Sequence, residues 1–274
     1  MLATVGVSTL GLTAGNGAAS EHEADDEDGD GADDEANGEA EAMVRVAHLS
    51  PDAPAVNVYV DAQPDGNEPA VAGLEFTDVT GYLPLPVGER EVIVTAAGDD
   101  EPISPTPLTL ELGEAAYTVA AIGKLEPDCG VPAFTIDVLV DDLSPLEDGT
   151  GRVRVYHAVP DAPAVDVGVG PVDDPELFLA KSLVFSNSGP DASVDAGTYP
   201  VTVYPANCLD PVAGPLDVEV RDGQVLTVFA TGTFQTESGD PSIEPVLAYE
   251  EAMAENGDDS DDSGDGSDED SGDH

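Results

Sequence analysis

Apolar residues alternate with other residues at a period of two in short runs through the middle of the chain. The runs are five to eight residues long, and clusters of Pro, Gly, Asp and Asn separate them every eight to twelve residues. This pattern is typical of half-buried β-strands joined by turns. The alternating positions include Val46, His48, Val56, Val58, Val60, Val92, Val94, Leu108, Leu110 and Leu112. Residues 43–249 show no capped stripe with the 3.6-residue helical period, so we predict an all-β protein.

The strand pattern occurs twice along the chain. Val44–Val60 (VRVAHLSPDAPAVNVYV) and Val153–Val169 (VRVYHAVPDAPAVDVGV) are identical at 12 of 17 positions, at an offset of 109 residues. The same offset relates YTVAAIG at 117–123 to LTVFATG at 226–232. This period is too long for a solenoid and indicates two tandem domains. Strands at this spacing in about 100 residues predict an immunoglobulin-like β-sandwich in each copy.

The two copies leave acidic segments at both ends. The expected boundaries are a signal-like segment at 1–19, an acidic tail at 20–42, the first sandwich at 43–142, a linker at 143–151, the second sandwich at 152–249 and a second acidic tail at 250–274. Each tail holds twelve acidic residues, no Lys or Arg, and almost nothing apolar to bury. Segments of this composition are expected to be disordered and solvated.

The acidic excess extends into the expected sandwiches. The chain has 58 Asp and Glu against 7 Lys and Arg, a net charge of −51, and residues 43–249 alone hold 34 acids against 7 bases. Self-repulsion of this kind destabilises a compact state in dilute salt. At about 1 M salt the screening length falls to roughly 3 Å, and most of the repulsion is lost. We expect a protein adapted to high salt; an acidic secreted protein from a low-salt habitat is the alternative. Nucleic acid and anionic membranes are poor partners for such a surface.

The first nineteen residues, MLATVGVSTLGLTAGNGAA, are uncharged and mildly apolar. They are similar to the apolar part and cleavage end of a secretory signal that lacks its basic region. We therefore expect a true start site further upstream and an extracellular or cell-surface protein. The alternative is a flexible terminus without a targeting role. The run is too short and too rich in Gly, Thr and Ser to be a transmembrane helix.

The repeated opening resembles a known family. VRVAHLSPDAPAVNVYVD is similar to the signature of the domain-of-unknown-function family numbered 4397, which often occurs in tandem in exported bacterial and archaeal proteins. The resemblance covers nearly the whole of both copies. The second copy departs from the signature, with Val159 in place of Ser50 and Gly168 in place of Tyr59. The resemblance implies an immunoglobulin-like sandwich in a surface or secreted protein, and it implies no catalytic residues, since none are established for the family.

The repeated motif contains residue types that can carry chemistry. They are His48, Pro51, Asp52 and Pro54 and the equivalents His157, Pro160, Asp161 and Pro163. One His and one Asp per copy fall short of the three or four protein ligands of a zinc site. We expect a structural corner, in which the prolines fix two φ angles, the Asp bonds amides two residues on and the His bonds across the corner. A metal or catalytic role is the alternative.

Other candidate sites are weaker. Ser50 lies two residues after His48, but a triad also needs an orienting acid and an oxyanion hole, and the second copy has Val159 there. Cys129 and Cys208 do not have metal-site spacing; they could form a disulfide in an oxidising exterior or remain free thiols. The segment 261–266 is similar to the start of a calcium loop, but residue 272 is Gly where such a loop needs Glu.

Together these features predict a non-enzymatic exported or cell-surface protein that acts in adhesion, assembly or cell-envelope interaction. Its expected partners are cell-envelope proteins or polysaccharide, and we expect no cofactor. The alternative is a protein that binds a saccharide or a divalent cation through loops of the two sandwiches. A hydrolase is a third hypothesis, with the weakest support.

Overall fold

The computed structural model describes residues 40–253 except 104–106, 237–238 and 240. Within these residues every regular element is a β-strand, which confirms the predicted all-β class. In this part of the chain no helix is long and apolar enough to cross a membrane. The signal-like segment, most of both acidic tails and the calcium-loop-like segment lie outside the described residues.

The first sandwich has eight strands in two four-stranded sheets, with the orders β4-β1-β7-β8 and β3-β2-β5-β6. The pairs are antiparallel except β1 and β7, which run parallel. The strands are β1 Glu41–His48, β2 Val56–Val60, β3 Val71–Leu74, β4 Leu83–Pro86, β5 Gly88–Ala96, β6 Leu108–Leu112, β7 Ala116–Ile122 and β8 Thr135–Asp141.

The second sandwich repeats this topology. Its sheets have the orders β12-β9-β16-β17, with β13 also paired to β9, and β11-β10-β14-β15. The parallel pair is again present, between β9 and β16. The strands are β9 Thr150–His157, β10 Val165–Val169, β11 Leu177–Leu183, β12 Asn187–Ser188, β13 Ala192–Asp195, β14 Gly197–Pro205, β15 Ala213–Val220, β16 Gln224–Thr233 and β17 Ser242–Glu251.

Alternation along the strands builds a separate core in each sandwich. Val46 and Val58 are buried between the sheets of the first copy, and their equivalents Val155 and Val167 are buried in the second. Each buried valine contributes about 1.5–3 kcal/mol relative to an exposed one. The two tandem immunoglobulin-like sandwiches predicted from the period-two pattern are therefore confirmed.

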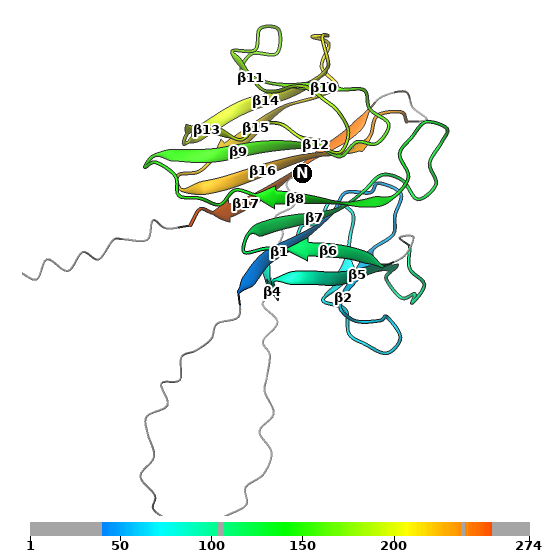
Figure 1. Cartoon of the computed structure of the whole chain (residues 1–274). Coiled ribbons are helices and arrows are strands. Elements are labelled where there is room, and N and C mark those ends of the chain that lie inside the picture. The colour runs from blue at the N-terminus through cyan, green and yellow to red at the C-terminus, as the bar shows by residue number, and fades with distance from the viewer. Residues whose placement is uncertain (1–39, 104–106, 237–238, 240, 254–274) are drawn as a thin grey trace, which may run out of the picture.

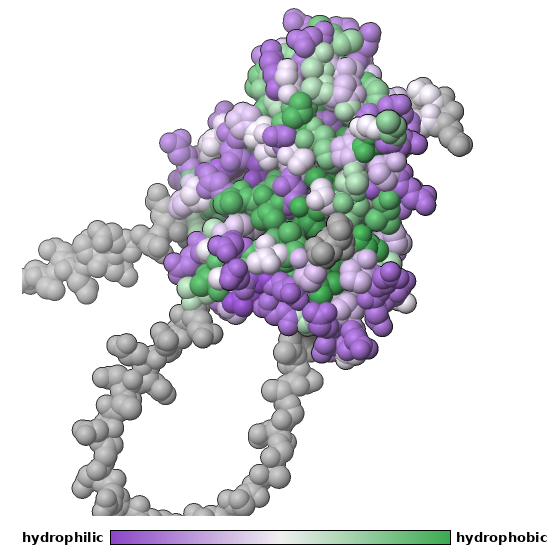
Figure 2. Space-filling view, turned by 45° about the vertical axis from the view of Figure 1, so that its right-hand side comes forward, coloured by the Kyte–Doolittle hydropathy of each residue, from purple (hydrophilic) through white to green (hydrophobic). Residues whose placement is uncertain are grey.

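A third apolar cluster joins the two sandwiches. Ala47, Leu49 and Ile122 of the first copy pack with Tyr156 and Phe229 of the second, and all five are buried. The sheet with β1, β7 and β8 therefore faces the sheet with β9, β16 and β17, while β2 and β5 lie on one outer side and β10 and β14 on the other (Figure 1). Figure 2 shows hydrophobic residues gathered across the middle of one face, with hydrophilic residues concentrated toward its lower end.

The strands reach further than the expected sandwich boundaries. β1 begins at Glu41 and β17 ends at Glu251, so residues that their composition places in the acidic tails belong to the sheets. Leu143, at the start of the expected linker, is buried. Composition marks where apolar residues become scarce, whereas a strand continues as long as its backbone has a partner.

Candidate functional site

His48, the last residue of β1, is fully buried. Its Nε2 lies 2.9 Å from the carbonyl oxygen of Pro54, and the backbone N–H of Ser50 donates to its Nδ1 at 3.4 Å. Because Nδ1 accepts, the ring proton lies on Nε2 and is donated to Pro54. Burial lowers the pKa of His48, while the bond to Pro54 and the charge of Asp78 raise it. Both ring nitrogens are therefore occupied by the backbone of the motif itself.

Asp52 connects the motif to a segment that is distant in the sequence. Its carboxylate accepts the N–H groups of Leu125 at 2.8 Å and Glu126 at 3.1 Å, 73 and 74 residues further along the chain. The bond to an amide two residues on, expected from the sequence, is not formed, because that position is Pro54, which has no N–H. The aspartate ties the corner to the segment that follows β7.

The second copy repeats these contacts. The Nε2 of His157 lies 3.3 Å from the carbonyl oxygen of Pro163, and Nδ1 accepts a backbone N–H at 3.2 Å. Burial lowers the pKa of His157. The carboxylate of Asp161 accepts the N–H groups of Phe234 at 2.8 Å and Gln235 at 3.0 Å. Pro51 and Pro160 lie in the turns that open the two corners.

Ser50 is not arranged as a nucleophile. Its hydroxyl donates to the carbonyl oxygen of Gly123 at 2.8 Å and lies 3.5 Å from Asp52. The contact to His48 comes from the backbone N–H of Ser50 and not from the hydroxyl. The serine is fully buried, so its hydroxyl is one more link between the corner and the segment after β7.

The cysteines do not add a site. Cys129 is exposed, Cys208 is half-buried, and both are free thiols, which decides between the two alternatives left open by the sequence. Among residues 40–253, apart from the gaps given above, no three His, Cys, Asp or Glu side chains are grouped to hold a metal ion.

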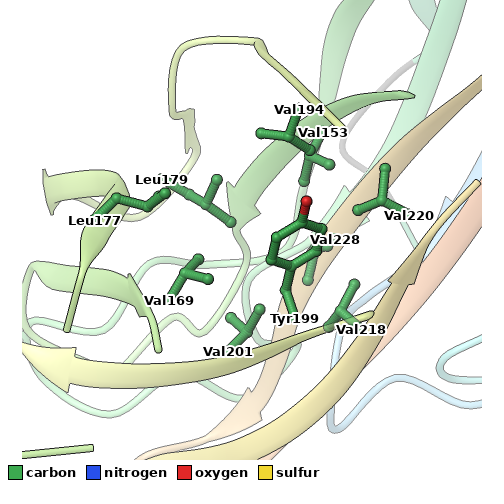
Figure 3. Close-up of a pocket in the computed structure, with 10 residues that line it drawn as sticks. All are labelled: Val153, Val169, Leu177, Leu179, Val194, Tyr199, Val201, Val218, Val220 and Val228. Carbon is green, nitrogen blue, oxygen red and sulfur yellow. The ribbon is translucent and has the colours of Figure 1, made fainter. Parts of the chain in front are cut away.

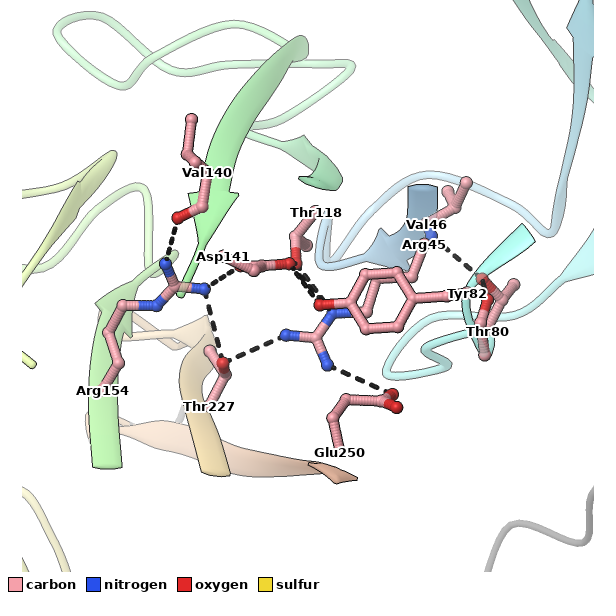
Figure 4. Close-up of polar contacts among 11 residues, drawn as sticks. Arg45, Val46, Thr80, Tyr82, Thr118, Val140, Asp141, Arg154, Thr227 and Glu250 are labelled. Atoms are coloured by element: carbon pink, nitrogen blue, oxygen red, sulfur yellow. Dashed lines mark hydrogen bonds and ion pairs between the residues drawn. The ribbon is translucent and has the colours of Figure 1, made fainter. Parts of the chain in front are cut away.

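The main concentration of buried polar groups lies between the two sandwiches (Figure 4). Asp141, at the end of β8, accepts hydrogen bonds from Tyr82 and Thr118, each at 2.6 Å, and from Arg154 of the second copy. Arg45 donates to Thr118 at 2.7 Å. The side chains of Arg45 and Asp141 are each only 2% exposed. A buried charge is tolerated only when it is paired and hydrogen-bonded.

Arg45 also crosses to the second sandwich. It donates to the hydroxyl of Thr227 at 3.0 Å and lies 3.5 Å from the carboxylate of Glu250. Its guanidinium lies over the ring of Tyr82, 5.1 Å from the centroid. We call Arg45, Thr118, Asp141, Arg154, Thr227 and Glu250 the interface cluster. Its four charged side chains comprise two cations and two anions.

The interface cluster obeys the 109-residue offset. Arg45, Thr118 and Asp141 correspond to Arg154, Thr227 and Glu250. The ion pair between Arg45 and Glu250 therefore becomes the pair between Arg154 and Asp141 when the copies are exchanged. Contacts that map onto each other in this way define an isologous interface, as in a two-fold symmetric dimer.

The pseudo-symmetry does not extend to every contact across the interface. The hydroxyl of Tyr156 donates to Asp137 at 2.6 Å, and Ser186 donates to the same carboxylate at 2.7 Å. The exchanged equivalents of Tyr156 and Asp137 are Ala47 and Val246, which belong to the apolar cluster between the sandwiches. The same place is thus polar on one side of the pseudo-axis and apolar on the other.

Burial perturbs the titrating groups of this interface. It raises the pKa of Tyr82 and of Tyr156 well above the usual range, and hydrogen bonds to Asp141 and Asp137 add to these shifts. Burial also raises the pKa of Glu250, and Arg45 opposes that shift. Both tyrosines therefore stay protonated and act as hydrogen-bond donors.

The sequence predicts the corners as structural motifs but does not predict the interface cluster. A signal was present, because Arg45 and Arg154 are repeated inside the best-matched strand, where a charged side chain sits between valines. Thr118 and Thr227 repeat at the same offset. Repeated charged or polar residues within an apolar strand indicate a buried face that the local alternation pattern does not explain.

The comparisons with known proteins place the chain by family. No curated protein gives a match. One solved structure, of a candidate cell adhesion protein from Bacteroides uniformis, is 9% identical with a TM-score of 0.23, and the match covers 77% of this chain and 99% of that one. Another, from Bacteroides eggerthii, is 10% identical with a TM-score of 0.21, over 77% and 96% of the two chains. These scores support no argument about this protein.

The family model is more informative. The model described as Domain of unknown function (DUF4397) matches residues 42–168 and 151–260. The two matches correspond to the two copies and together span well over half of the chain. The chain therefore belongs to the DUF4397 family and carries its domain in two tandem copies.

Proposed function

We propose that the protein is a non-enzymatic module, exported or held at the cell surface, that acts in adhesion, assembly or contact with the cell envelope. One observation carries the proposal: the repeated histidines and aspartates are engaged by backbone groups within the corners. A general base or nucleophile needs a free ring nitrogen or hydroxyl within reach of a substrate. The motif offers neither.

The eight repeated motif residues serve architecture in this proposal. Asp52 and Asp161 each bind two amides of the segment that follows the parallel strand, and the histidines close the turn on the near side. The corners therefore hold the loop ends of each sandwich in fixed positions. Rigidly held loops are the surfaces through which sandwich domains commonly bind partners.

The proposed partners are envelope proteins or polysaccharide. The strongly negative surface favours partners that are neutral or cationic, or contacts made in high salt. Each of the two sandwiches presents its own set of loops to such partners.

The proposal is tested on intact cells of the organism that encodes the chain. Protease treatment of unbroken cells should degrade the protein and leave a cytoplasmic marker intact. Deletion of the gene should reduce attachment of the cells to one another or to a surface, and re-expression should restore it. Protection of the protein from protease until the cells are lysed would contradict the surface assignment.

Thermal unfolding of the purified chain in molar salt separates this proposal from ligand binding by the loops. A ligand that binds only the native state raises the melting temperature, by an amount set by its concentration relative to Kd. We expect no shift with millimolar calcium or with a panel of soluble oligosaccharides. A saturable shift with either would instead support the saccharide- or cation-binding alternative.

A further inference from the structure

The second sandwich contains an apolar groove. The groove has a volume of about 460 Å³, and its lining comes from both sheets. It extends to β15 and β17, which are the edge strands of those sheets. Among the residues that the structure describes, the lining is made mostly of valine, proline and alanine and holds no ionisable side chain.

Comparison of the copies explains why the groove is open. Phe134 precedes the first residue of β8, is only 7% exposed and belongs to the core of the first sandwich. At the offset of 109 residues its equivalent is Ile243, which lines the groove. The replacement removes an aromatic ring from the space between the sheets.

At three further positions the second copy also has a smaller side chain than the first. The strand pairing equates Leu110 with Val218, because their partners Arg90 and Tyr199 are themselves equivalent. The equivalent pairs are Ile103 and Val212, Leu110 and Val218, and Ile136 and Pro245. In each pair the second copy has fewer side-chain carbons, and its residue lines the groove. The first copy packs the corresponding residues against its core.

The apolar space continues deeper into the second sandwich. A cavity of about 30 Å³, drawn in Figure 3, shares Val201, Val218 and Val228 with the groove. The hydroxyl of Tyr199, which also lines the cavity, donates to the carbonyl oxygen of Asp195 at 2.8 Å. A space walled by hydrocarbon lacks the polar partners that a bound water needs.

We propose that the groove binds a small, uncharged hydrophobic molecule. Its volume falls within the range of about 300–1,000 Å³ that is typical of small-molecule sites. The described lining residues offer no group to neutralise a charge, and the net negative charge of the chain disfavours anions. The first copy fills the same space with the hydrocarbon side chains of Phe134 and Ile136, which indicates the chemistry that the space accepts.

The uncharged probe N-phenyl-1-naphthylamine tests the proposal with the full chain in 2 M KCl. Its fluorescence should rise saturably with one probe bound per chain. Ile243→Phe restores the ring of the first copy, so it should weaken probe binding at least tenfold without lowering the melting temperature. Val212→Ile is a smaller change for use if the first variant does not fold, and it should weaken binding at least threefold.

The first sandwich supplies the matched control. Phe134→Ile should open the equivalent space and raise the stoichiometry toward two probes per chain. The proposal is overturned if the wild-type chain shows no saturable binding, if Ile243→Phe leaves the affinity unchanged, or if Phe134→Ile adds no site. It is also overturned if light scattering shows a wild-type dimer that Ile243→Phe converts to a monomer, because a second copy would then occupy the groove.

Discussion

His48 and His157 show how the motif uses its polar residues. Each ring accepts a backbone N–H at Nδ1 and faces a proline carbonyl at Nε2. The neutral tautomer with the proton on Nε2 satisfies both contacts. The imidazolium would carry a second proton on Nδ1, facing the backbone N–H that now donates to it. The buried rings are therefore matched to one protonation state.

This match predicts a pH dependence of stability. Burial lowers the pKa values of both histidines in the folded state. As the pH falls below about 6.5, the histidines of the unfolded chain therefore bind protons more readily than those of the folded chain. The free energy of unfolding should therefore fall from pH 7 to pH 5. In chemical unfolding in 2 M KCl, the His48→Gln/His157→Gln double variant should show a shallower fall than the wild type. Equal slopes would contradict the prediction.

Asp161 offers a second test at this scale. Its side chain is 2% exposed, and its removal leaves the N–H groups of Phe234 and Gln235 without their acceptor. We expect Asp161→Ala to lower the free energy of unfolding by about 1–3 kcal/mol. Asp65→Ala, at an exposed position, serves as the control and should change stability by less than about 0.5 kcal/mol. A loss no larger than in the control would exclude the anchoring role.

At the scale of elements, the ends of β7 and β16 require glycine. Gly123 and Gly232 have φ angles of 82° and 111°. A Cβ at either position would collide with the carbonyl oxygen of Ala133 or of Ser242, across the start of the neighbouring strand. Two constraints therefore act together, a left-handed backbone and a close approach of the paired chain.

Alanine substitution separates these constraints. Gly66 has a φ angle of 83° but open space around its Cβ position, so Gly66→Ala measures the conformational cost alone, about 1 kcal/mol. Gly123→Ala and Gly232→Ala should each cost more, because the paired strand must also move. Chemical unfolding in 2 M KCl measures the loss in the free energy of unfolding for each of the three variants. Equal losses in all three variants would show that the collision is relieved without cost.

One departure of the second copy from the family signature, Gly168 in place of Tyr59, is explained by packing between neighbouring strands. Tyr59 is buried on β2, whereas a Cβ at Gly168 would lie 3.1 Å from the ring of Tyr204 and 3.0 Å from Pro175. Tyr204 is itself fully buried and corresponds to Thr95. The aromatic ring has thus moved from one strand to the next, and the glycine makes room for it.

The sequence predicts the elements well because alternation and turn residues are local signals. It predicts the two sandwiches because the offset repeats over the whole copy. It does not predict that Asp52 reaches Leu125, because the contact joins residues 73 positions apart. Nor does it place Glu250 beside Arg45, because an acidic composition around residue 250 predicts a tail. Contacts between the copies depend on their orientation, which neither periodicity nor composition encodes.

At the scale of the whole molecule, the interface cluster makes the two sandwiches energetically dependent on each other. Arg154 binds Asp141 and donates to the carbonyl oxygen of Val140 at 2.8 Å. Its removal takes away one of the cations that pair with the carboxylate of Asp141, whose side chain is only 2% exposed. We expect Arg154→Ala to lower the free energy of unfolding by about 3–5 kcal/mol.

Calorimetry of Arg154→Ala should also show two separated unfolding transitions where the wild type shows one, because the sandwiches lose part of their mutual stabilisation. Arg221→Ala is the control, since its ion pair with Glu219 is exposed and such pairs contribute about 0–1 kcal/mol. A small loss and a single transition in Arg154→Ala would show that the apolar cluster alone joins the sandwiches.

The charge of the whole chain predicts a salt dependence. With 34 acids against 7 bases between residues 43 and 249, repulsion among surface carboxylates should weaken the folded state in dilute buffer. The free energy of unfolding should therefore increase as KCl is raised from 0.1 M to 2 M, because the screening length shortens severalfold. Equal stability at both concentrations would contradict adaptation to high salt.

The covalent joining of two pseudo-symmetric halves has a consequence for variation and for assembly. In a dimer of identical chains every substitution occurs twice, on both sides of the axis. Here Tyr156 can face Asp137 while Ala47 remains small, and one half can keep an open groove while the other keeps a filled core. The connection at 142–149 also gives each half a millimolar effective concentration of its partner, so the pairing persists at any dilution.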